Sequence, residues 1–167
     1  MQERTEARGR REVVLASLAG IIVAPASARG PTDNWAAAWP RTDFRRGGID
    51  LAEIISGGPL RDGIPPSDRP ECAPAGADVG PAAREPVIGL VLNGEARAYP
   101  LRALTWHEMV NDAVGGVPAG VTYCPLCNTA IGFARRLDGQ VLGFGTTGKL
   151  RRSDLVMYGR QTESWWQ

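Results

Sequence analysis

Two of the three cysteines of this chain lie three positions apart, within the stretch TYCPLCN at residues 122–128. Thiols at this spacing can exchange with disulfides, bind a thiophilic metal ion or form a fixed disulfide bond. A redox-active pair normally lies where a strand enters a helix, because the helix N-terminus lowers the pKa of the first thiol. After Cys127, however, the alternation of Thr129, Ile131 and Phe133 predicts a strand. The pattern therefore favours a knuckle, a tight turn with both sulfurs facing one metal ion.

The residues around the two sulfurs suit such a turn. Pro125 fixes φ after Cys124, and Asn128, after Cys127, is the non-glycine residue best able to adopt a left-handed conformation. Zinc, copper or iron normally takes more ligands than these two cysteines supply. His107 is the only histidine and the expected third ligand, although a half-buried histidine bonded to backbone is an equally open interpretation.

The completing ligand stays open at this point. Cys72 lies in a proline-rich segment with no ligand pattern around it, and we interpret it as incidental. Glu108 and Asp112 are four residues apart on an expected helix, but ordinary capping and solvation explain them better than a carboxylate pair. The candidates for the remaining ligand are Cys72, Met109, Asp112, Asp154 and Met157.

The stretch GFGTTGKL at residues 143–150 matches the first part of a phosphate-binding G-x-x-x-x-G-K pattern. Leu150 stands where that motif needs Ser or Thr, and the following residues resemble a turn and a strand rather than a helix. We therefore reject nucleotide binding and interpret residues 145–148 as a close-approach loop beside the cysteine turn.

The N-terminal 28 residues resemble a signal peptide. The basic residues 8–11 precede an apolar run and the small residues Ala-Ser-Ala at 26–28, which predicts export and cleavage after Ala28. Arg10 and Arg11 also resemble a twin-arginine signal. We expect an extracytoplasmic protein, periplasmic or secreted, that contacts a membrane only if this segment is uncleaved.

The remaining chain is expected to form one domain. Without the leader it has 15 basic and 15 acidic side chains (19 − 4 and 18 − 3), so nothing indicates a nucleic-acid partner. Residues 29–48 form an irregular lead-in whose two tryptophans could dock on the domain of residues 49–167. Within that domain, 49–56 predicts a short helix, and 57–86 is a proline- and glycine-rich loop.

The segments after residue 86 predict mainly antiparallel hairpins. Asn93-Gly94 between two apolar runs indicates a type I′ hairpin, and Asp138-Gly139 indicates another tight turn. A helix is expected over 106–114, capped by Thr105 and Glu108 and ended by glycines 115 and 116. Further strands are expected at 118–123, 129–137, 140–146, 153–158 and 163–166. The fold class is therefore α+β, mainly antiparallel β with one or two short helices.

Four stretches, at residues 56–65, 85–112, 115–133 and 146–167, resemble an exported bacterial and archaeal family grouped as domain of unknown function 3179. The resemblance brings no established activity. It implies that the chain is truncated at its C-terminus and that Cys72 is incidental. The positions matching the family's recurring pattern are His107, Cys124, Cys127, Lys149, Ser153, Asp154 and Tyr158.

Three functions remain open at this stage. The first is binding of a thiophilic metal ion, or metal-dependent redox chemistry, through Cys124, Cys127 and His107. The second is thiol–disulfide exchange by the same cysteines. The third is a non-catalytic binding module in which these cysteines form a structural disulfide.

Overall fold

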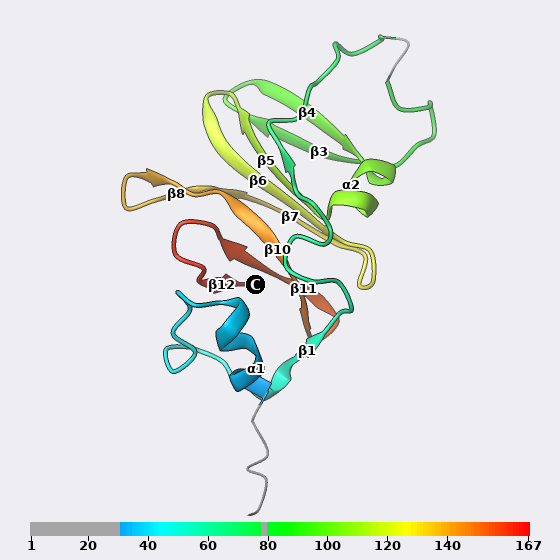
Figure 1. Ribbon diagram of the computed structural model, residues 1–167. Helices are drawn as coiled ribbons and strands as arrows, with labels where there is room; N and C mark the ends of the chain where they lie inside the picture. Colours follow the sequence, from blue (N-terminus) through cyan, green and yellow to red (C-terminus); the bar gives the residue numbers. More distant parts are fainter. Residues whose placement is uncertain (1–30, 78–79) are drawn as a thin grey trace, which may run out of the picture.

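The computed structural model describes residues 31–77 and 80–167, so the expected leader at 1–28 lies outside the described residues (Figure 1). The helical elements are α1 (Pro31–Ala38), the 3-10 turn η1 (Leu51–Glu53) and α2 (Leu101–His107). The strands are β1 (Ile54–Ser56), β2 (Ser67–Asp68), β3 (Val87–Leu92), β4 (Glu95–Pro100), β5 (Met109–Val114), β6 (Val117–Cys124), β7 (Thr129–Ala134), β8 (Arg136–Leu137), β9 (Gln140–Val141), β10 (Phe144–Arg151), β11 (Asp154–Gly159) and β12 (Trp165–Trp166).

Two four-stranded sheets form the body of the molecule. One has the strand order β1-β10-β11-β12, and the other has the order β2-β5-β6-β7. Two-stranded ribbons, β3-β4 and β8-β9, accompany them, and every pairing is antiparallel except that of β2 with β5. The expected α+β class is confirmed. No helix in the described part of the chain is long and apolar enough to cross a membrane.

The core of the second sheet lies beneath helix α2 and the β3-β4 ribbon. Leu104 of α2 is almost completely buried and belongs to a cluster with Tyr99, Val110, Val121 and Tyr123. The expected type I′ hairpin is confirmed, since Asn93 and Gly94 have φ angles of 48° and 80° and β3 pairs with β4 in register. This packing holds the ends of β5 and β6 in place at the cysteine turn.

The helix expected over 106–114 is wrong in its position. Helix α2 ends at His107, where Glu108 adopts a left-handed conformation with φ of 55°, and β5 follows at once. Thr105 donates to the carbonyl of Leu101 instead of capping a helix start. Gly115 and Gly116, with φ angles of 55° and 76°, form the β5–β6 hairpin turn, a role for which the same two glycines are equally suited.

The N-terminal part of the domain also differs from expectation. Residues 49–56 form only η1, which Asp50 caps through the N–H of Ala52, and then strand β1. The two isoleucines of β1 suit a strand, and they pair with residues 150 and 151 of β10. The lead-in at 29–48 contains helix α1 instead of being irregular throughout. Its Trp39 is only 2% exposed and packs on Tyr158, so the expected docking of this segment is confirmed.

The expected loop at 57–86 begins with an extended segment that is hydrogen-bonded along β10. The N–H groups of Gly57 and Asp62 donate to the carbonyls of Gly148 and Thr146. Residues 145–148 are therefore part of a strand with a bulge between Thr146 and Lys149, not a loop. At Gly148, with φ of 66°, a Cβ atom would collide with the backbone of residue 59, so the expected close approach is present.

Candidate metal centre

Two hairpin tips from different sheets meet at the cysteine pair. One is the β6–β7 turn, in which Asn128 has φ of 51° as the knuckle pattern requires. The other is the β10–β11 turn, in which Arg152 and Ser153 have φ angles of 51° and 68°. Figure 1 shows the two tips on the same side of the molecule. The site therefore combines residues that are far apart along the chain.

Cys124, Cys127 and Asp154 form the group at this junction. One ligand atom from each residue, two sulfurs and a carboxylate oxygen, lies within 4.8 Å of the others. The Sγ of Cys127 donates to Oδ1 of Asp154 over 3.4 Å, and the Sγ of Cys124 donates to the carbonyl of Ser153 over 3.4 Å. The N–H of Leu155 also donates to Oδ1 of Asp154, which fixes the orientation of the carboxylate.

Burial controls the chemistry of the first thiol. Cys124 is 1% exposed at the end of β6, and this burial raises its pKa to about 11, although the backbone N–H groups of Cys127 and Leu126 act in the opposite direction. Backbone N–H groups directed at a cysteine sulfur are what a knuckle provides. In the metal-free protein this thiol is therefore protonated at neutral pH, and a bound cation would be needed to hold it as a thiolate.

The backbone of His107 lies at the same end of the sheet as the cysteine turn. Its side chain, however, is not part of the group formed by Cys124, Cys127 and Asp154. The carbonyl of Glu108 accepts from the N–H of Tyr123, so the residue before Glu108 lies beside the end of β6. The Nδ1 atom of His107 is 2.8 Å from the carbonyl of Pro65. Because a carbonyl only accepts, Nδ1 donates, and the neutral ring carries its lone pair on Nε2.

Only some of the other residues singled out by the resemblance reach the cysteine turn. Ser153 contributes its backbone carbonyl to the site, whereas Lys149 lies within β10, opposite Val156. Tyr158 donates to the carboxylate of Asp62 and stacks under the Arg61 guanidinium. Lys149 and Tyr158 are therefore not among the three residues brought together at the cysteine turn.

Of the acidic and cysteine candidates that the sequence leaves open, Asp154 is the one that the described structure brings to the cysteine pair. Asp154 joins the cysteines, while Cys72 is exposed in the 57–86 segment. Met109 is completely buried in the sheet, and Asp112 accepts from the buried hydroxyl of Tyr99. The remaining candidate, Met157, lines a groove beside the site. Glu108 and Asp112 do not share a helix, so the alternative of a carboxylate pair on one helical face is wrong.

Sequence comparison assigns the chain to a family. The family model described as "Protein of unknown function (DUF3179)" matches residues 61–167, and the chain belongs to this family. The matched region contains both hairpin tips and the whole Cys124, Cys127 and Asp154 group. No curated protein and no solved structure matches the chain.

Proposed function

We propose that Cys124, Cys127 and Asp154 bind a thiophilic metal ion and that the protein acts through this ion. The observation that supports the proposal is the convergence of two sulfurs and a carboxylate oxygen within 4.8 Å of one another. Ligand atoms around a tetrahedral zinc ion are about 3.3 to 3.8 Å apart, given bond lengths of about 2.0 to 2.3 Å. The 3.4 Å between Cys127 Sγ and Asp154 Oδ1 already lies in that range.

The types of the three ligands narrow the choice of metal ion. Two thiolates favour zinc, iron or copper over magnesium or calcium, which prefer oxygen ligands. Three protein ligands leave one position of a tetrahedron open, which is typical of a catalytic or substrate-binding metal rather than a purely structural one. We therefore propose a reactive metal centre, with redox chemistry as its use if the ion is iron or copper.

His107 stays a proposed ligand that would compete with water or a substrate for the open position. Its donated Nδ1 leaves Nε2 free to bind a metal, and a backbone carbonyl on the other ring nitrogen is the usual arrangement of metal-bound histidine. The imidazole would have to come closer to the sulfurs than it lies while Nδ1 is bonded to the carbonyl of Pro65. A water molecule or a substrate takes this position if His107 stays on Pro65.

Thiol–disulfide exchange is less well supported. An exchanging cysteine needs a stabilised thiolate, but burial raises the pKa of Cys124 to about 11. Cys124 also ends a strand and is followed by a turn into β7, so no helix N-terminus supports it. Both cysteines of the pair are free thiols in the structure, as a metal site requires.

The place of action belongs to the proposal as well. The basic, apolar and small-residue pattern of residues 1–28 supports export, so we propose that the metal is bound outside the cytoplasm. A pair of exposed thiols in an oxidising compartment would form a disulfide unless burial or a metal protected it. Burial of Cys124 and a bound ion would together provide that protection.

Titration with Co²⁺ tests the metal proposal. The full chain is purified anaerobically without metal, and thiolate-to-cobalt charge-transfer absorption is followed as Co²⁺ is added. We expect one Co²⁺ per chain in the wild type, and loss of the charge-transfer band in Cys124→Ser and Cys127→Ser. Cys72→Ser is the matched control and keeps the band, because Cys72 is exposed and apart from the site.

A second readout covers the case in which a variant folds poorly. Urea unfolding with and without Zn²⁺ should show stabilisation by the ion in the wild type and in Cys72→Ser. The proposal is wrong if the folded wild type takes up neither Co²⁺ nor Zn²⁺. If both thiols of the purified protein react only after a reductant is added, the disulfide alternatives are supported instead. His107→Ala should weaken Co²⁺ binding about 10- to 100-fold if His107 is a ligand.

A further inference from the structure

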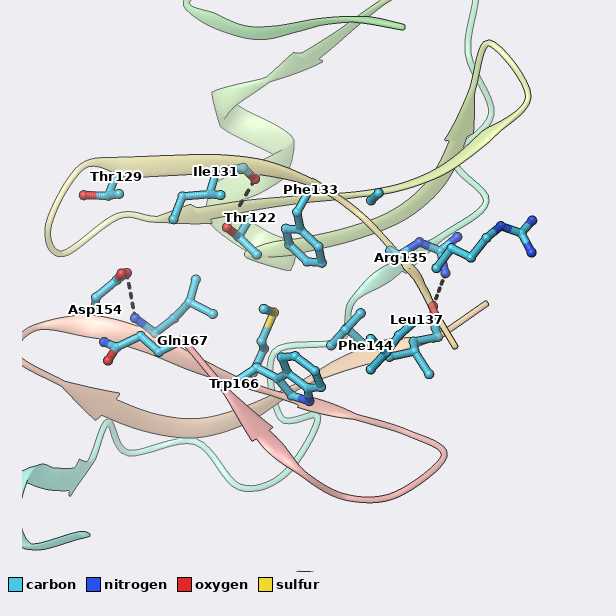
Figure 2. A pocket seen from close by; sticks show the side chains of 15 residues that line it. Thr122, Thr129, Ile131, Phe133, Arg135, Leu137, Phe144, Asp154, Trp166 and Gln167 are labelled. Carbon is cyan, nitrogen blue, oxygen red and sulfur yellow. Dashed lines mark hydrogen bonds between the residues drawn. The ribbon is translucent and has the colours of Figure 1, made fainter. Parts of the chain in front are cut away.

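An open groove runs from the candidate metal centre between the two sheets. Its cavity volume is about 350 Å³, within the range of sites for small molecules. Figure 2 shows side chains of β7 on one wall, facing those of β10, β11 and β12 on the other. The apolar lining comes mainly from Ile131, Phe133, Phe144, Leu155, Met157 and Trp166.

Aromatic rings from both walls of the groove meet one another. Phe133 and Phe144 meet edge to face with ring centroids 5.3 Å apart, and Phe144 and Trp166 do so at 5.8 Å. Ring faces and edges arranged in this way attract a further flat aromatic group at similar distances. Ile131, which lines the groove, is 49% exposed, so part of this apolar surface is accessible from solvent.

The charges in the groove favour an uncharged ligand. Arg135 donates to the backbone carbonyls of Ala119, Leu142 and Asp112, so its guanidinium is occupied by the protein itself. Arg136 lies at the exposed rim and donates to Gly139. An anion inside the groove would therefore lack a free cationic partner and would be close to the carboxylate of Asp154.

Asp154 provides the polar end of the groove. Its Oδ1 atom accepts from Cys127 and from the N–H of Leu155, while no donor among the described residues bonds Oδ2. Figure 2 places this side chain at the end of the groove near Thr129. A carboxylate oxygen with spare acceptor capacity is suited to a hydroxyl donor.

We propose that the groove binds a small, uncharged aromatic molecule bearing one hydroxyl group, which donates to Asp154. Its ring lies against Phe133, Phe144 and Trp166, and its hydroxyl points toward the cysteine turn. Because the groove ends at Asp154, such a molecule would be the substrate or ligand of the metal centre. This connection to the metal rests on the proposed function. Binding in the groove itself needs no metal ion.

The test uses 2-naphthol as the probe and the metal-free full chain as the protein. Isothermal titration should show one saturable site per chain. Ile131→Glu should weaken binding at least tenfold, because it places a charge on the apolar lining of the groove. Val91→Glu is the matched control, since Val91 is an equally strand-bound side chain, 65% exposed, on β3 away from the groove. That variant should bind within twofold of wild type.

Two analogues test the chemistry of the ligand. 2-Methoxynaphthalene cannot donate and should bind about tenfold more weakly than 2-naphthol, and naphthalene-2-sulfonate should bind more weakly still. Absence of saturable 2-naphthol binding in protein that takes up Co²⁺ would overturn the groove proposal alone. Concentration-dependent dimerisation that Ile131→Glu abolishes would also overturn it, because a second copy of the chain would then cover the groove. Binding of 2-naphthol by a protein that takes up no metal leaves the groove proposal supported and the metal proposal refuted.

Discussion

The thiol of Cys124 in the metal-free protein is predicted to ionise at a much higher pH than the thiol of an unburied cysteine. Its burial raises the pKa from the ordinary value of 9.0 to about 11. The thiolate is the reactive form toward iodoacetamide, so the reaction rate follows its population. At pH 8 a pKa of 11 leaves about 0.1% thiolate, against about 10% for a pKa of 9, a roughly 100-fold difference.

The same shift predicts a loss of stability at high pH. A thiol whose folded pKa lies above its unfolded pKa stabilises the folded state fully below pH 9, and this contribution is lost as pH rises toward 11. Two pKa units correspond to about 3 kcal/mol of unfolding free energy. Cys124→Ser has no thiol to ionise, so the difference between wild type and this variant isolates the effect from other groups.

Both effects are measured on reduced, chelator-treated protein. Iodoacetamide labelling at pH 7 to 11, followed by peptide mass spectrometry, gives the rate at each cysteine, with the exposed Cys72 as internal control. Urea unfolding at pH 8 and pH 11 gives the stability change. We expect Cys124 to react at least 100 times more slowly than Cys72 at pH 8, with a rate that rises through pH 10. Labelling of Cys124 as fast as Cys72, levelling off below pH 9, would refute the reasoning and favour an activated redox thiol.

Three further predictions concern the site and its supports. Asp154→Asn should weaken Co²⁺ binding 10- to 100-fold in the same titration, whereas Asp138→Asn, in an exposed turn, should leave it unchanged. Gly148→Ala should lower the unfolding free energy by more than Gly139→Ala does, because of these two positions only residue 148 would have a Cβ that strikes the backbone. Gly139→Ala should cost only about 1 to 2 kcal/mol, for the left-handed φ. Equal urea midpoints for the two variants would contradict this. Burial acts to raise the pKa of Glu163, but hydrogen bonds from Arg41 and Arg61 outweigh it, so the pKa is lowered and its stabilisation is lost as pH falls. Glu163→Gln should therefore be less stable at pH 7 and lose less stability on acidification, as measured by urea unfolding at pH 3 and 7.

Local turn chemistry explains which parts of the fold were predictable. Asn93-Gly94 and Asp138-Gly139 supply positive φ angles at low cost, so their hairpins can be recognised from sequence and are present. Gly115-Gly116 is ambiguous because two glycines can end a helix or turn a hairpin. The choice was made by tertiary pairing of β5 with β6, which local sequence does not contain.

The candidate site shows the same limit. The cysteine turn follows from Pro125 and Asn128, which suit a knuckle. The β10–β11 turn cannot be recognised from sequence in the same way, because Arg152 and Ser153 adopt positive φ angles without a glycine. Contacts from a distant segment accompany this turn, since Arg152 bonds Glu53. Local sequence therefore does not single out Asp154 from the other candidate ligands, because its place beside the cysteines depends on the meeting of two distant hairpins.

The meeting of two hairpin tips has a consequence for the order of assembly. Cys127 and Asp154 are 27 residues apart and lie at the tips of hairpins from different sheets, so their contact ties the two sheets together. In a fully unfolded chain, closing a loop of this length would cost about 3 kcal/mol of chain entropy. An ion shared by the two tips would act as a clamp that reports completed docking of one sheet on the other. Metal loading would then follow folding and mark the chains that had finished it.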